Sequence, residues 1–187
     1  MVKRGMVRKA ITVLSPKSMG FTLIEIIVVV AIIGILVVAF YPMVLNTLEN
    51  RDIENAARLI QMTFQQAKFE AIRTRLDHRV RFWQGNDGRW NYTIERLIQA
   101  GQWEPVHGFI PRQIPAKFEV TISLPNASTG TGYALIFTPI GTIAKDNYDP
   151  NLRSVSLHSR KLSSQGQLGT ITIYVYAGGS FQYVRTA

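Results

Sequence analysis

An acidic residue beside a long apolar segment is the most informative chemical feature of the sequence. Every residue from Ile26 to Tyr41 is apolar or glycine, and Glu25 stands directly before this run. A carboxylate in hydrocarbon costs on the order of 2.5–3.5 kcal/mol. We therefore expect Glu25 to snorkel at the membrane edge, to be neutral, or to gain a cationic partner.

The peptide bond between Gly20 and Phe21 is a candidate cleavage site. A protease can hold a glycine in extended form without hindrance from a side chain, although a simple flexible junction is the alternative. A cut here would leave the apolar segment on the mature chain and create a cationic amine at Phe21. It would also remove five basic residues and no acid, which lowers the formal charge from +9 to +4.

Residues 21–41 predict a transmembrane helix, since roughly 20 apolar residues cross a bilayer. The basic residues precede it, so the positive-inside rule places the N-terminus in the cytoplasm and the rest of the chain outside. A cleaved secretory signal is the alternative. Such a signal has a shorter apolar core without an acid and a small-residue cleavage site, whereas this run ends in Phe40-Tyr41-Pro42.

Helical periodicity resumes after Pro42 and predicts an amphipathic continuation over residues 42–76. Apolar residues recur three and four positions apart, at Ile53, Ala56, Ala57, Ile60, Phe64, Ala67, Ala71 and Ile72. We expect one nearly continuous helix over residues 21–76, with a kink at Pro42 because proline removes a helical hydrogen bond. Gly34 is a second position at which this helix could loosen.

Residues 77–187 predict a β-rich domain, which makes the fold α+β: a long transmembrane-plus-amphipathic helix packed on a C-terminal antiparallel β-sheet. Gly85-Asn86-Asp87-Gly88 predicts a hairpin, and the segments 98–117 and 144–152 predict long loops. The expected strands are 79–83, 90–97, 118–124, 133–137, 153–158, 170–177 and 181–184.

Together, the basic leader 1–20, the Gly20-Phe21 pair, Glu25 and the apolar run resemble the class III signal of type IV pilins and type II secretion pseudopilins. The resemblance implies that a membrane prepilin peptidase cuts after Gly20 and methylates the amine of Phe21. It also implies that Glu25 of one subunit pairs with the Phe21 amine of a neighbour during filament assembly. The partners would then be other pilins or pseudopilins, the peptidase and the lipid of the bacterial inner membrane, with the β-rich domain in the periplasm.

The later segments are similar to the GspH/FimT group of minor pseudopilins. These are the Arg/Ala-rich helix 58–75, the run Leu135-Ile136-Phe137-Thr138-Pro139-Ile140-Gly141, and the strand 171–176 before a glycine turn. The resemblance implies a structural subunit at or near the tip of a type II secretion pseudopilus. One alternative is a minor pilin that primes a type IV pilus, with or without a role in DNA uptake. Another is a membrane-tethered enzyme or receptor that does not polymerise.

No enzyme, cofactor or metal motif emerges from residues 77–187. The chain has no cysteine, and His78, His107 and His158 lack the spacing of zinc ligands. Asp146, Asn147 and Asp149 predict an Asx-rich turn in preference to a calcium loop, because the terminal glutamate of an EF-hand is missing.

A cluster of basic residues raises nucleic acid as a partner. Trp83 and Trp90 could add base stacking. A solvated helix face explains part of the cluster equally well, and the sequence departs from the Gly-Arg-rich C-terminal element of DNA-binding FimT-like proteins. The candidate DNA contacts are Arg73, Arg75, Arg79, Arg81 and Arg185.

Overall fold

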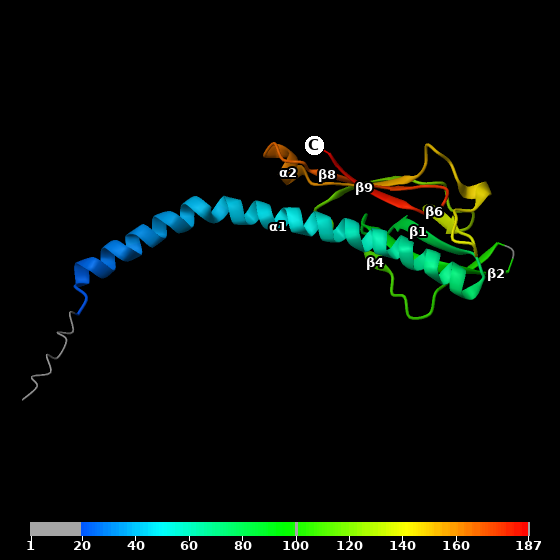
Figure 1. Cartoon of the computed structure of the whole chain (residues 1–187), viewed down its shortest axis with the longest axis horizontal. Coiled ribbons are helices and arrows are strands. Elements are labelled where there is room, and N and C mark those ends of the chain that lie inside the picture. Colours follow the sequence, from blue (N-terminus) through cyan, green and yellow to red (C-terminus); the bar gives the residue numbers. More distant parts are fainter. Residues whose placement is uncertain (1–19, 100, 187) are drawn as a thin grey trace, which may run out of the picture. The chain divides into compact units, whose positions relative to one another are not determined.

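The computed structural model describes residues 20–99 and 101–186, so the predicted leader lies outside the described residues except for Gly20. The described chain begins with one long helix, α1 (Leu23–Thr74), and continues into a domain of short strands (Figure 1). It divides into two compact units after Pro42.

The helix α1 is bounded by identifiable local features. It begins two residues later and ends two residues earlier than the predicted range 21–76, which is the usual uncertainty of helix ends. At its C-terminal end, Arg75 adopts a φ of 58° while its N–H donates to the carbonyl of Ala71 at 3.0 Å. This left-handed residue stops the helix.

The β-rich domain confirms the predicted antiparallel β-structure, and its strands are divided between two sheets. The first has the order β3-β2-β1-β6, with β4 also pairing with β2, and the second has the order β5-β7-β8-β9. The strands of the first sheet are β1 (His78–Gln84), β2 (Trp90–Gln99), β3 (Gln102–Pro105), β4 (Arg112–Gln113) and β6 (Tyr133–Phe137). Those of the second are β5 (Glu119–Ser123), β7 (Ser154–His158), β8 (Thr170–Val175) and β9 (Phe181–Thr186).

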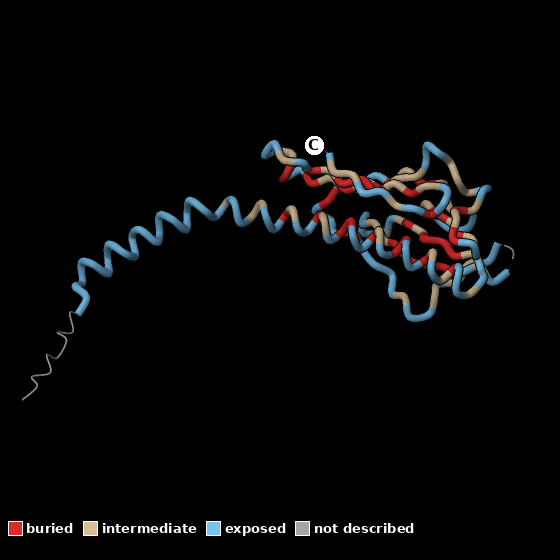
Figure 2. The backbone as a smooth tube through the Cα atoms, in the orientation of Figure 1, coloured by how far each residue is buried: buried red, intermediate tan, exposed pale blue. Residues whose placement is uncertain are grey.

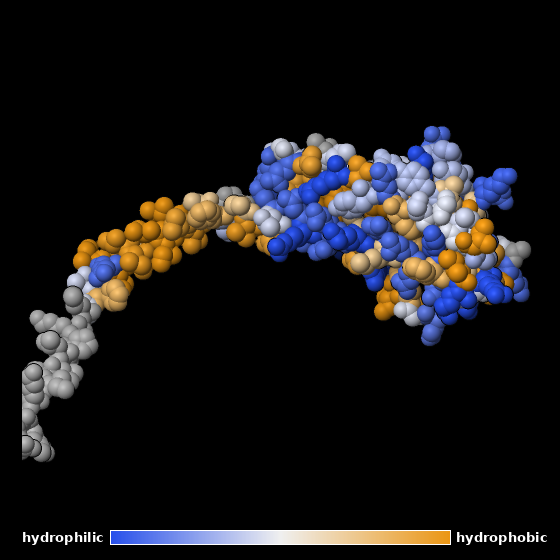
Figure 3. All heavy atoms as spheres, in the orientation of Figure 1, coloured by the Kyte–Doolittle hydropathy of each residue, from blue (hydrophilic) through white to orange (hydrophobic). Residues whose placement is uncertain are grey.

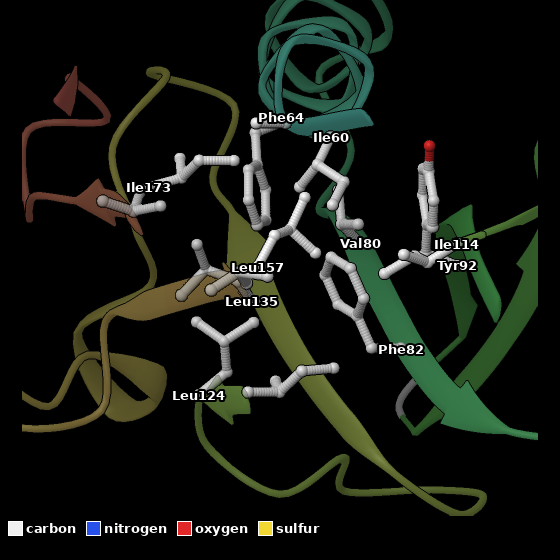
Figure 4. Close-up of a cluster of buried hydrophobic side chains, with 14 of the residues drawn as sticks. Ile60, Phe64, Val80, Phe82, Tyr92, Ile114, Leu124, Leu135, Leu157 and Ile173 are labelled. Atoms are coloured by element: carbon white, nitrogen blue, oxygen red, sulfur yellow. The ribbon is translucent and has the colours of Figure 1, made fainter. Parts of the chain in front are cut away.

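The core lies where the C-terminal half of α1 meets both sheets. Ile60 and Phe64 point from α1 toward Val80 of β1, Leu135 of β6 and Ile173 of β8 (Figure 4). Alternation along each strand places these apolar side chains on one face, as the period of two requires. Buried residues accordingly concentrate along this half of α1 and the facing strands (Figure 2). The predicted packing of an amphipathic helix on β-structure is confirmed.

Two predicted loops contain regular structure. The segment 98–117 includes β3 and β4, and the segment 144–152 includes the short 3-10 helix η1 (Lys145–Asn147). A further short helix, α2 (Arg160–Ser164), buries Leu162. The Asx turn is present, because Asp149 Oδ1 accepts the N–H of Asn151 at 2.8 Å.

Candidate functional site

The predicted cleavage bond lies in exposed, non-helical chain. Gly20 and Phe21 precede the first residue of α1, and Phe21 is 77% exposed. Among the described residues, a Cβ atom on Gly20 would meet nothing within 4 Å. No contact within the described chain crowds this bond, and cleavage there stays a prediction.

Thr22 caps the start of α1. Its Oγ1 accepts the backbone N–H of Glu25 at 3.3 Å, and its carbonyl accepts the N–H of Ile26 at 3.3 Å. Thr22 is thus the N-cap residue and Glu25 the third helical residue, which is the spacing of a capping box. Thr22 is missing from the predicted site residues, although the pattern Thr-x-x-Glu in the sequence is a signal that could have revealed it.

The position of Glu25 has an electrostatic consequence. It lies in the first turn of α1, where the unpaired N–H groups give the helix end a partial positive charge. A carboxylate is favoured at this end by about 0.3–1 kcal/mol. The local structure thus tolerates an acid at the edge of the apolar segment, and the pairing of Glu25 with a neighbouring Phe21 amine stays a prediction.

The helix α1 is the one helix of the described residues that is long and apolar enough to cross a membrane. Its apolar side chains from Leu23 to Tyr41 are exposed, and the same stretch forms a continuous hydrophobic surface in Figure 3. Exposed apolar area of this kind is stable only when lipid or other helices cover it. This first unit is therefore suited to a membrane anchor.

Gly34 and Pro42, the positions at which the sequence predicts flexibility and a kink, both lie within continuous helix. The helical backbone of α1 runs through both Gly34 and Pro42. A Cβ atom on Gly34 would meet nothing within 4 Å, so no contact within the described chain requires glycine there. The kink at Pro42 and the flexibility at Gly34 stay predictions.

The candidate DNA contacts differ in exposure, and most of them are paired within the protein. Arg73 is exposed and bonds to Glu70 at 2.5 Å, a hydrogen bond that raises the pKa of its guanidinium, and Arg75 lies exposed at the end of α1. Arg79 is buried, with 3% of its side chain exposed, and bonds to Glu95 at 2.6 Å.

Arg81 and Arg185 are also engaged within the protein. Arg81 shares the carboxylate of Glu95, and Arg185 bonds to Glu54 of α1 at 3.0 Å. The burial of Arg79 and the contacts of Arg185 argue against these two residues as part of an exposed surface that follows successive DNA phosphates. DNA binding by the remaining arginines stays a prediction.

Comparisons with known proteins find relatives of the N-terminal segment and of the fold. The prokaryotic N-terminal methylation motif matches residues 18–41. Two structures of the minor pseudopilin EpsH from the Vibrio cholerae type II secretion system are similar to the fold. One has a TM-score of 0.52 and 13% identity over 73% of this chain and 96% of that chain. The other has a TM-score of 0.51 and 12% identity over 71% of this chain and 95% of that chain.

A third structure, the type IV minor pilin FimU of Pseudomonas aeruginosa, has a TM-score of 0.46 and 14% identity over 73% of this chain and 90% of that chain. No curated protein matches the sequence. The chain thus combines a prokaryotic N-terminal methylation motif with the α+β fold seen in EpsH, which confirms the resemblance to type IV pilin-like proteins.

Proposed function

We propose that the chain is the precursor of a non-enzymatic minor pseudopilin, a subunit at or near the tip of a type II secretion pseudopilus. Prepilin peptidase cuts between Gly20 and Phe21 and methylates the new amine of Phe21. The mature subunit is a single-pass protein of the bacterial inner membrane, with residues 21–41 in the bilayer and the β-rich domain in the periplasm.

The observation that carries the proposal is the joint occurrence of the motif and the exposed helix. The methylation motif covers residues 18–41, and the apolar side chains of this stretch of α1 lie unburied. The likeness of the fold to EpsH supports the pseudopilus, since EpsH is a minor pseudopilin of a type II secretion system.

Glu25 gives the filament its register. In the proposed assembly its carboxylate meets the Phe21 amine of a neighbouring subunit, away from water. Packing of apolar helices alone is compatible with several axial offsets, whereas a desolvated ion pair is satisfied at one offset only. The neighbours are other pseudopilins, and before assembly the lipid of the inner membrane covers α1.

Deletion of the gene distinguishes a role in type II secretion from a role in a type IV pilus. The proposal predicts that proteins exported by the type II pathway accumulate in the periplasm, that pilus number is unchanged, and that the wild-type gene restores export. Normal export together with loss of pili would contradict the pseudopilus and support a minor pilin that primes a type IV pilus.

A further inference from the structure

Two arginines occupy the face of the first sheet that points away from the core. In β1, Arg79 and Arg81 alternate with the buried core residues Val80 and Phe82. Register places Arg79 opposite Glu95 of β2. Although this face is directed outward, the side chains of Arg79 and Arg81 are only 3% and 21% exposed.

Both arginines share a single carboxylate. The Nε of Arg79 donates to Oε2 of Glu95 at 2.6 Å, and the Nε of Arg81 donates to Oε1 at 2.8 Å. Their other acceptors in the described chain are neutral. Arg79 donates to the hydroxyl and the carbonyl of Thr129 at 3.3 and 3.2 Å, and Arg81 donates to the carbonyl of Thr131 at 3.4 Å.

The cluster therefore carries one uncompensated positive charge in a largely desolvated place. Burial lowers the pKa of the Arg79 guanidinium, and repulsion by Arg81 lowers it further, so the two effects outweigh the attraction of Glu95. A buried charge without a counterion is costly. A second anion at this position would balance the pair of cations.

A hollow of about 480 Å³ gives such an anion access to the arginines. Ile98 and Trp103 form apolar parts of its wall, and the Trp103 ring stacks on Arg79 with the guanidinium carbon 4.4 Å from the ring centre. Gly130 stands beside Arg81, where a Cβ atom would come within 3.3 Å of Nη1. With glycine at this position, residue 130 places no side chain against that nitrogen, while the ring of Trp83 lies on the Arg81 guanidinium with its centre 4.6 Å from the guanidinium carbon.

We propose that this hollow binds a carboxylate carried on a peptide, supplied by an acidic side chain or by a C-terminus. A guanidinium has five N–H donors in a planar fork that matches a carboxylate, and three of the five on Arg79 are used within the described chain. Ile98 and Trp103 can contact an apolar residue next to the acid. The inference does not depend on the proposed function.

Nucleic acid fits this hollow less well than a peptide. A nucleic-acid strand requires a positively charged groove that follows several successive phosphates, with free aromatic faces for the bases. Here a single excess charge lies beside the carboxylate of Glu95, and one face of Trp103 is already covered by Arg79.

Titration of the full-length chain in detergent with short peptides tests the site. Calorimetry would compare two pairs of peptides. The first pair, acetyl-Leu-Glu-Leu-amide and acetyl-Leu-Gln-Leu-amide, differs in the charge of the side chain. The second pair, Leu-Leu-Leu with a free C-terminus and Leu-Leu-Leu-amide, differs in the charge of the C-terminus. We expect saturable binding of at least one carboxylate form, about tenfold or more tighter than its uncharged match. The two pairs distinguish an acidic side chain from a C-terminus as the source, and a ten-nucleotide oligothymidylate tests nucleic acid.

Three variants locate the binding. Arg81→Gln removes one cation, and Gln102→Glu adds an anion at the exposed rim without removing a contact of the arginines, so each should weaken binding by about tenfold. Arg160→Gln removes the same charge from an exposed ion pair with Glu119 and should leave binding unchanged. Binding of the oligonucleotide alone, equal binding of both members of each peptide pair, no binding at all, or the same affinity in all three variants would overturn the proposal.

Discussion

Arg185 of the last strand and Glu54 of the long helix are joined by an ion pair of 3.0 Å across 131 positions of sequence. The same guanidinium donates to the carbonyl of Leu168 at 3.0 Å and to the side chain of Asn50. One side chain thus connects β9, α1 and the segment before β8, close to where α1 enters the domain.

Replacing Arg185 with glutamine should lower the stability of the domain. The variant loses the ion pair and hydrogen bonds to three partners, but the pair is partly exposed, so we expect a loss of about 1–2 kcal/mol. Thermal unfolding of the full-length chain in detergent, followed by near-ultraviolet circular dichroism, measures the change. The control is Arg160→Gln, whose arginine is 81% exposed and should matter little. Equal melting temperatures for the two variants would mean that the Arg185 contacts contribute nothing.

Lys117 pairs with Glu49 and Asp52 of α1, and this second connection should make the stability of the domain fall at alkaline pH. Burial alone would lower the pKa of Lys117, but hydrogen bonds to Asp52 and Glu49, with the charges of both acids, outweigh burial and raise the pKa above its ordinary value of 10.5. A group with a raised pKa stabilises the fold below its unfolded pKa and loses that contribution as pH rises through the folded pKa. Between about pH 7 and pH 10, where the carboxylates of Asp52 and Glu49 are charged, the advantage of the wild type over Lys117→Gln should therefore be constant, and it should shrink at higher pH. An advantage unchanged at higher pH would contradict this account.

Truncation of Phe64 tests the position of the core. Phe64 is fully buried, with its ring centre 5.8 Å from that of Phe82 and 5.9 Å from that of Phe181. Phe64→Ala should cost about 3–5 kcal/mol through lost contacts and a cavity. Phe69→Ala, on the same helix, removes a ring that is 67% exposed and should change stability by less than about 0.5 kcal/mol. Comparable losses in the two variants, measured by urea unfolding, would show that α1 does not pack as described.

The sequence predicts those parts of the fold in which local pattern and tertiary structure agree. The spacing from Ile53 to Ala71 identifies the buried face of α1, and the turn around Gly85–Gly88 identifies the first hairpin, in which the N–H of Gly85 donates to the carbonyl of Arg89 at 2.8 Å. The strand β3 escapes prediction because it is short and contains Pro105, and β4 because it has only two residues. The separation into two sheets depends on pairings between distant segments, which periodicity does not reveal.

The arginines show a different limit of sequence reasoning. Arg79 and Arg81 are typical of a solvated or DNA-binding surface when only their types are considered. Extending the hairpin register back from its turn, however, places Arg79 opposite Glu95, so the ion pair could have been predicted. The cover provided by Trp103 and Thr129 could not, because both lie in segments without a regular pattern.

Neutralising Glu25 should impair assembly without preventing processing. Glu25→Gln keeps the size of the side chain and a polar group but cannot form an ion pair with the Phe21 amine. We expect normal leader removal and at least about tenfold less protein in sheared filaments, since loss of one partner of a buried pair leaves the other uncompensated. Glu70→Gln, which alters an acid paired with Arg73 farther along α1, is the matched control. Full incorporation of the Glu25 variant would remove the basis for the proposed register.

Mass spectrometry of the N-terminus of the protein isolated from its native membrane tests the central claim most directly. The account predicts that the mature chain begins at Phe21 with one hydrogen of its amine replaced by a methyl group, and that the leader stays attached when the prepilin peptidase gene is deleted. A chain that retains residues 1–20 in wild-type cells, or one cut after the apolar segment, would contradict it.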